Sequence, residues 1–289
     1  LWLALLAYLA AGARVRAAEP GGNIVISELM YHPYHAANAA EDTKQEWIEL
    51  FNRSLQAVSL AGWRCGDGVD FVFPNVTIGA RQYLVVAADV DAFTSRYPDV
   101  TNVVGGWMGW LSNSGEKIEL ADAAGTVVHT LRYADQGDWG ARQLGPVSSG
   151  HRGWEWSSTS DAGRRSQELI NVSLSNESGQ NWAPSLVDGG TPGGANSVAS
   201  GNIAPLILAA GHWPIIPGPA DPVTVTARIL DERTAGLTVT IRYRLDTSTY
   251  VNQTTYAEFD AASYAGVPMR DDGAHGDGQA GDGVFGGVI

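Results

Sequence analysis

Short blocks of alternating apolar and polar residues recur along this chain. The first two are 24–31 (IVISELMY) and 46–51 (EWIELF). Because a period of two places successive side chains on opposite faces of a strand, each block predicts a β-strand with one face in a core. Turns that contain Gly, Asn and Asp separate these blocks from the ones that follow. The predicted strands are 24–31, 46–51, 58–63, 71–73, 82–87, 117–120 and 127–133.

The block at 46–51 shows the limit of this pattern. Trp47 and Glu49 fall on one face of the predicted strand, and Ile48 and Leu50 fall on the other. Alternation alone does not decide which of the two faces is inside.

Helical periodicity is scarce. Residues 90–97 (VDAFTSRY) are the best candidate for a helix, of one or two turns. Residues 136–185 are rich in Gly, Ser, Trp and Arg and have few alternating blocks, so they predict a long irregular excursion. We expect this excursion to cover a sheet edge, and the alternative is a functional loop.

Many short strands with Gly-rich turns favour stacked sheets over alternating strands and helices. The first domain is expected at 22–198, closed by the segment GGTPGGANS, with a linker at 199–202. A second alternating pattern then begins, with VTVTARILD and LTVTIRYRLD as its clearest strands. It predicts a second domain at 203–289 that is incomplete at its C-terminus.

The first residues have a different character. Residues 1–13 form an apolar run that is shorter than the ~20 residues needed to span a bilayer. Small residues follow at a suitable cleavage position. Residues 1–18 are therefore predicted to be a secretory signal peptide that lacks its first residues, and no membrane span is expected.

Six blocks occur in a fixed order along the first domain: IVISELMYHP, EWIELFN, LAGWRCGDGVDFVFP, QYLVVAAD, LSNSGEKIELAD and GGTPGGANS. This ordered set resembles the lamin-tail domain. The resemblance implies an all-β chain, with an immunoglobulin-like β-sandwich followed by a second, truncated immunoglobulin-like β-sandwich. It also implies a binding or scaffold unit, and it carries no catalytic residues.

The second pattern is similar to an immunoglobulin-like module that follows lamin-tail domains in large bacterial secreted proteins. Some of those proteins continue into a kinase domain that resembles spore-coat protein H (CotH). Such a catalytic domain would lie beyond residue 289.

The composition limits the classes of partner that are expected for this chain. The net charge is −13 and only 17% of the residues are charged. Nucleic acid is not expected as a partner, because phosphate binding requires clustered Lys and Arg. An acidic surface is compatible with a secreted protein and with divalent cations. The single cysteine, Cys65, cannot form a disulfide within the chain and is expected to be a small buried hydrophobe.

Four aspartates among glycines are the candidate metal ligands: Asp271, Asp272, Asp277 and Asp282. Ca²⁺ prefers several carboxylate and carbonyl oxygens, and glycines let the backbone fold around the ion. The spacing is not that of an EF-hand. The alternative, which we favour, is a turn in which the aspartates bind backbone N–H groups. A zinc site at His32 and His35 is weighed likewise against an ordinary loop at a strand end.

Tryptophans are numerous in the predicted loops. Burial in the sandwich is the expected role for most of them, and the alternative is an exposed surface for sugars or a partner protein. They are Trp107, Trp110, Trp139, Trp154, Trp156 and Trp182.

The functional expectation is a secreted or cell-envelope protein without catalytic activity in this chain. Its role would be adhesion, scaffolding or binding of a protein or glycan at the cell surface. The alternative is the N-terminal positioning region of a larger secreted enzyme, a CotH-like kinase or a hydrolase. Calcium is the only cofactor suggested, and no catalytic residue is nominated.

Overall fold

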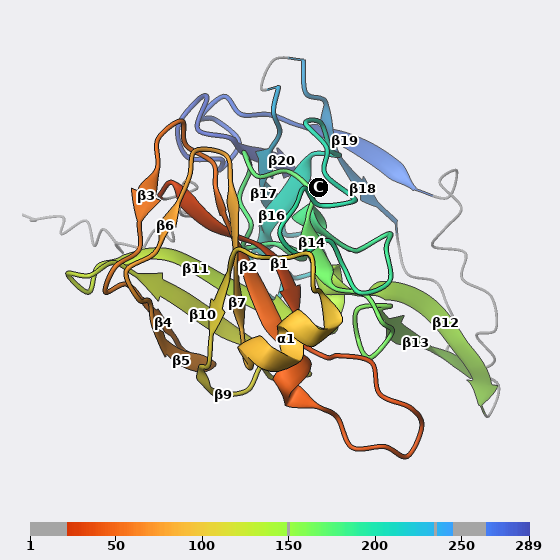
Figure 1. The fold of residues 1–289 in the computed structure, drawn as a ribbon. Helices are drawn as coiled ribbons and strands as arrows, with labels where there is room; N and C mark the ends of the chain where they lie inside the picture. Colours follow the sequence, from red (N-terminus) through yellow and green to blue (C-terminus); the bar gives the residue numbers. More distant parts are fainter. Residues whose placement is uncertain (1–21, 149–150, 234–235, 245–263) are drawn as a thin grey trace, which may run out of the picture.

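The computed structural model describes residues 22–148, 151–233, 236–244 and 264–289 (Figure 1). Within these residues the fold is β-rich with one short α-helix, which confirms the predicted all-β class. The first unit stacks a six-stranded sheet against a five-stranded sheet. The predicted signal peptide lies outside the described residues. Among the described residues, no helix is long and apolar enough to cross a membrane.

The six-stranded sheet has the order β15-β14-β1-β2-β7-β8. Its neighbouring strands are antiparallel except β7 and β8, which are parallel. A β-bulge interrupts the pairing of β1 with β2 between Ile26 and Glu28. The strands are β1 (Ile24–Met30), β2 (Trp47–Asn52), β7 (Tyr83–Ala87), β8 (Val103–Gly105), β14 (Gln167–Leu169) and β15 (Trp182–Pro184).

The five-stranded sheet has the order β11-β10-β4-β5-β9. Its strands are β4 (Arg64–Gly66), β5 (Val69–Val72), β9 (Met108–Gly109), β10 (Gly115–Ala121) and β11 (Val127–Ala134). Strands β3 (Val58–Ser59) and β6 (Thr77–Ile78) pair with each other and form a separate two-stranded sheet. The predicted strand at 58–63 is wrong beyond residue 59. There Trp63 donates its N–H to Leu60 and Gly62 takes a φ of +76°, so the chain turns.

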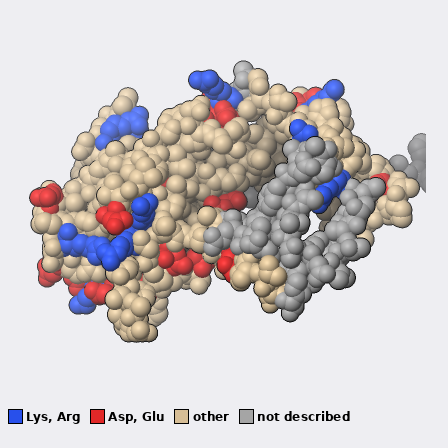
Figure 2. Space-filling model, turned by 90° about the vertical axis from the view of Figure 1, so that its right-hand side faces the viewer, with Lys and Arg blue, Asp and Glu red and all other residues tan. Residues whose placement is uncertain are grey.

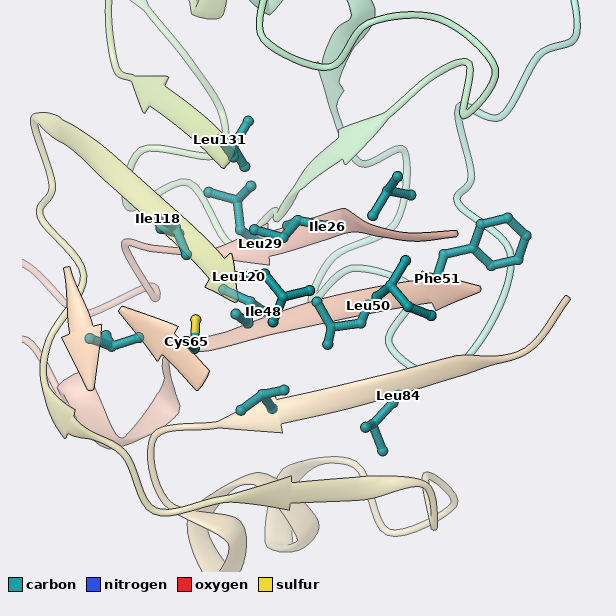
Figure 3. Packing of buried hydrophobic residues seen from close by; sticks show 14 of the residues in the cluster. Ile26, Leu29, Ile48, Leu50, Phe51, Cys65, Leu84, Ile118, Leu120 and Leu131 are labelled. Atoms are coloured by element: carbon teal, nitrogen blue, oxygen red, sulfur yellow. The ribbon is translucent and has the colours of Figure 1, made fainter. Parts of the chain in front are cut away.

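Apolar side chains from both sheets meet between them (Figure 3). Ile48 and Leu50 of β2 belong to this core, and so do Ile118 and Leu120 of β10. Cys65 packs in the same core, as expected from the sequence, with 1% of its surface exposed.

The other face of the six-stranded sheet is also covered. Helix α1 (Val90–Arg96) begins after Asp89, whose side chain accepts the N–H of Ala92. Phe93 of this helix packs on Trp47, with ring centroids 6.1 Å apart. A second, smaller core of Met30, Trp47, Val85, Ala87 and Phe93 results. Both faces of β1 and β2 are therefore buried, which is why alternation could not choose between them.

Residues 136–185 contain four strands instead of one irregular excursion, so that part of the prediction is wrong. The expected cover of a sheet edge is confirmed, because β14 pairs with β1. The hairpin of β12 (Ala141–Ser148) and β13 (His151–Ser157) projects as an arm (Figure 1). Strand β14 then pairs with β1, and β15 pairs with β14, so this region extends the main sheet. Strands β14 and β15 lack a readable alternation because three residues cannot display one. The 3-10 helices are η1 (Thr43–Gln45), η2 (Gly137–Trp139) and η3 (Gly179–Asn181).

The C-terminal unit contains a three-stranded sheet of order β16-β17-β20 and the pair β18-β19. Its strands are β16 (Leu206–Trp213), β17 (Thr224–Leu230), β18 (Val239–Tyr243), β19 (Ala265–Met269) and β20 (Val284–Val288). Ala227, Ile229 and Met269 form its small core. The two units touch at two places. Gln180 accepts the N–H of Ile207 at 2.8 Å and donates to its carbonyl at 2.9 Å, and Asn171 donates its side-chain amide to Glu232 at 2.5 Å.

Candidate functional site

Three glutamates lie side by side on the six-stranded sheet, each on its own strand. Glu28 of β1 pairs with Glu49 of β2 on one side and with Glu168 of β14 on the other. All three are fully buried. Glu49 follows Trp47 at a spacing of two, so the glutamates occupy the face that α1 covers further along. We refer to Glu28, Glu49 and Glu168 as the glutamate cluster.

The segment 189–198 (GGTPGGANSV) lies over these carboxylates, and we call it the strap. One backbone N–H of the strap binds each glutamate. Thr191 donates to Glu28 at 2.8 Å, Gly193 to Glu49 at 2.6 Å and Val198 to Glu168 at 3.0 Å. The sequence showed this segment only as a Gly-rich domain end, whereas its amides are the ligands of the cluster.

Hydroxyl groups complete the cluster. A charge-free donor set of this kind satisfies buried carboxylate oxygens without bringing in a cation. Ser27 donates to Glu49 at 2.9 Å, Ser166 to Glu28 at 2.5 Å, and Ser197 to Glu168 at 2.8 Å.

Thr191 contributes a hydroxyl as well as its N–H. Its Oγ1 lies 3.0 Å from Oε2 of Glu28 and 3.0 Å from Oε1 of Glu168. A hydroxyl has a single hydrogen, so it can donate to only one of these two oxygens. The second contact is a hydrogen bond only if that carboxyl group is itself protonated and donates to Thr191.

Burial favours such a proton. It raises the pKa of Glu28 to about 7, although hydrogen bonds from Ser166 and Thr191 act in the opposite direction. Burial also raises the pKa of Glu49 well above its usual range, and the charge of Glu28 adds to this effect. A carboxyl group taken out of water prefers its neutral form. Glu28 and Glu49 therefore both hold a proton to higher pH than an exposed glutamate does.

Two further contacts fix the ends of the strap. Tyr97 of α1 donates its hydroxyl to the carbonyl of Gly189 at 2.7 Å. Asn196 donates its side-chain amide to the carbonyls of Ser27 and Leu169, both at 2.8 Å. Ser27 lies at the bulge of β1, so Asn196 satisfies a carbonyl that the irregular ladder exposes.

A second acidic site lies at the start of β2. Glu46 is fully buried and accepts the N–H of Leu111 at 2.7 Å. Burial raises its pKa to about 8, and the charges of Glu41 and Glu116 contribute. Its other oxygen, Oε1, has no hydrogen-bond partner among the described residues. A neutral carboxyl group tolerates this position better than a carboxylate.

The four aspartates predicted as metal ligands lie in the loop between β19 and β20, and each accepts backbone N–H groups. Asp277 is buried and accepts from Asp272 at 2.6 Å, Gly273 at 2.8 Å and His275 at 2.9 Å. These hydrogen bonds lower its pKa, that from Gly273 first.

The other three carboxylates close the same loop. Asp271 accepts from Gly281 and Gly283, and Asp282 accepts from Val284. Asp272 accepts from Ala274 and from the ring of His275. In the described part of the chain, no three His, Cys, Asp or Glu side chains are grouped so that they could hold a metal. Calcium binding by Asp271, Asp272, Asp277 and Asp282 stays a prediction.

His32 and His35 lie in the loop that follows β1, which agrees with the expectation of an ordinary loop at a strand end. His32 lies 2.5 Å from Asp161 through Nδ1, and its ring stacks near that of His35 at 5.5 Å between centroids. Arg164 covers the ring of Tyr34 at 3.7 Å. These contacts tie the loop after β1 to the segment that follows the β12–β13 arm.

The tryptophans divide between core and surface. Trp107 and Trp182 are buried, whereas Trp110 is 67% exposed beside Met108 at 69%. Met108 lies opposite Asp70 across the β5–β9 ladder, and Val72 shares the face of Asp70. Trp139 is half-buried against Trp182, Trp156 is exposed, and the side chain of Trp154 lies outside the described residues.

Charged residues of both signs lie on the face shown in Figure 2. Blue and red groups there are small, and at the left of the view several of them lie directly beside one another. Lys117, for example, is paired with Asp67 and with Glu119.

Part of the first unit matches a known protein family. The family model of the Lamin Tail Domain matches residues 17–135. This part of the chain is similar to lamin tail domains. Among curated proteins, no relative matches the chain.

The lamin-tail match has two consequences. The family is a non-enzymatic, immunoglobulin-like domain, in agreement with the observed sandwich. The matched range ends before Glu168 and before the strap. The sheet that begins inside the match is nevertheless completed by β14 and β15 outside it, so the folded unit is larger than the lamin-tail match.

Proposed function

We propose that this chain is a non-catalytic binding module of a secreted or cell-envelope protein, and that its partner is another protein. The lamin-tail match of residues 17–135 supports this function, because that family is immunoglobulin-like and non-enzymatic. The signal-peptide character of residues 1–18 supports export.

The use of the buried carboxylates agrees with this proposal. In the glutamate cluster they bind the strap, and in the aspartate loop they bind the loop's own backbone. Groups engaged in this way hold the fold together. In an active site, ionisable groups would instead keep unused hydrogen-bonding positions directed toward a substrate cavity.

The outer face of β5 and β9 supports a protein partner. Val72 and Met108 expose apolar surface there, and Arg64 and Asp70 lie opposite them on the neighbouring strands. Trp110 follows β9 directly and is 67% exposed. An apolar centre with Trp and Met and a charged rim has the composition of a protein interface.

Binding of the full chain to arrays of cell-surface proteins and of glycans tests this function. The expected result is a protein ligand whose binding is reduced about tenfold or more by Trp110→Ser or Met108→Ser. Leu55→Ser is the matched control, because Leu55 is 81% exposed and lies outside this face. Binding that both Trp110→Ser and Met108→Ser leave unchanged would refute this face as the site, and binding to sugars alone would refute a protein partner.

The finer assignment to a larger secreted enzyme, with a CotH-like kinase or hydrolase domain, stays a prediction from the sequence. Reading the gene beyond codon 289 tests it directly.

A further inference from the structure

The strap connects the two units as well as covering the glutamate cluster. Val198 donates to Glu168, and Ser200 then donates to the carbonyl of Ile170 at 3.0 Å. Strand β16 begins only a few residues later, at Leu206. The contacts that hold the strap on the sheet therefore also hold the start of the linker to the C-terminal unit.

We propose that the strap and the glutamate cluster form a pH-operated latch. The strap stays closed while Glu28 or Glu49 retains a proton, and it opens when both of these carboxyl groups are ionised. Opening frees the link to the C-terminal unit without unfolding the sandwich.

The geometry of Thr191 gives the reason for the proton. With both Glu28 and Glu168 ionised, one of the two oxygens 3.0 Å from Thr191 Oγ1 faces a lone pair instead of a hydrogen. That contact becomes repulsive, in a place that water does not reach. Three adjacent carboxylates on paired strands also repel one another when all are charged.

The surroundings do not compensate for this charge. The donors that reach the six carboxylate oxygens are hydroxyls and backbone N–H groups. Strand β7 brings Tyr83 near the cluster, and α1 brings Tyr97, over whose ring Arg96 lies 5.7 Å from the centroid. Burial raises the pKa of both tyrosines, so they add no charge at neutral pH.

Linkage gives the direction of the effect. The closed strap keeps the carboxyl groups buried and therefore binds more protons than the open strap, in which they meet water. Raising the pH consequently shifts the equilibrium toward the open form. The sheet under the strap retains its ladders and the large core on its opposite face, so the change is local.

Three backbone amides report on the latch, one for each carboxylate. They are those of Thr191, Gly193 and Val198. Hydrogen exchange of the full chain, expressed as protection factors, removes the intrinsic effect of pH on exchange. From about pH 6 to about pH 9, protection of these amides should fall at least about tenfold. Amides of β10 and β11, such as Ile118 and Leu131, should keep theirs.

A variant and its control sharpen the test. Glu28→Gln cannot ionise, so the pH dependence of the three reporter amides should be much reduced. Glu177→Gln changes an exposed glutamate and should behave as the wild type. If Glu28→Gln does not fold, the wild-type protein still tests the latch. In NMR spectra, the chemical shifts of the Glu28 carboxyl carbon and of the Thr191 amide should change with pH at the same midpoint.

Two results would overturn the latch. One is constant protection of the reporter amides across this pH range. The other is a loss of protection that is equally large in β10 and β11, because a uniform loss means that the whole domain opens.

Discussion

Gly190 lies against the carboxylate of Glu28 so closely that a Cβ atom at this position would meet Oε1 of Glu28 at 2.3 Å. The same Cβ would meet Oγ of Ser166 at 2.5 Å, and the φ of Gly190 is +83°. The strap approaches the sheet at this point because its residue has no side chain.

Gly190→Ala should therefore destabilise the protein by about 1–3 kcal/mol, through backbone strain and through displacement of the Glu28 hydrogen bonds. The midpoint of urea unfolding measures this change. Gly201→Ala is the matched control, since a Cβ there has no neighbour within 4 Å, and it should alter stability by less than ~0.5 kcal/mol. Equal effects of the two substitutions would contradict the close approach.

Glu46 should make the stability of the protein fall as the pH rises. Its pKa is raised to about 8 by burial, from 4.5 in the unfolded chain. A group of this kind stabilises the fold fully below pH 4.5 and loses this contribution as the pH rises to about 8. Glu46→Gln removes the titration and retains an oxygen that can accept the N–H of Leu111.

The stability of Glu46→Gln relative to the wild type should thus increase between about pH 5 and about pH 8, by at most ~1.4 kcal/mol per pH unit. Urea unfolding at several pH values measures the difference, with Glu177→Gln as the control. A difference that is independent of pH would show that Glu46 is already ionised in the folded protein.

The aspartate loop should keep its shape without a metal. Its carboxylates already accept backbone N–H groups, so the melting temperature of the full chain should be the same in EDTA and in excess calcium. Asp277→Ala should lower it under both conditions, because three backbone N–H groups lose their acceptor. Calorimetry measures the melting temperatures of the wild type and of Asp277→Ala in EDTA and in calcium. A clear rise in the melting temperature with calcium would establish the predicted site instead.

Cys65 should be unreactive in the folded protein. It is buried, and burial raises the pKa of its thiol to about 12. Because the thiolate is the nucleophile, a disulfide reagent at about pH 8 should label the thiol only after unfolding. Rapid labelling of the native protein would mean that the core around β4 opens readily.

The sequence predicted the strands of the sandwich well where they were long enough to alternate. Strands β1, β2, β7, β10 and β11 and helix α1 lie within a few residues of their predicted positions. In these elements the local pattern and the tertiary packing have the same period, so the local signal was sufficient.

The glutamate cluster could not be predicted in this way. Glu28 and Glu49 occupy alternate positions of their strands, as residues facing water do. Their burial depends on Gly193 and Thr191, more than 140 residues away in the sequence, whose contribution is made largely by backbone N–H groups. Backbone donors leave no signature in side-chain identity. The segment GGTPGGANS consequently looked like the Gly-rich end of the domain.

The contact of Gln180 with Ile207 has a mechanical consequence. The side-chain amide of Gln180 presents one donor and one acceptor to the backbone of Ile207, as a neighbouring strand would. Tension applied to the C-terminal unit would therefore stretch both of these hydrogen bonds together, beside the hydrogen bond from Asn171 to Glu232. Shortening Gln180 to alanine should lower the force at which the two units separate while leaving the strength of each unit intact.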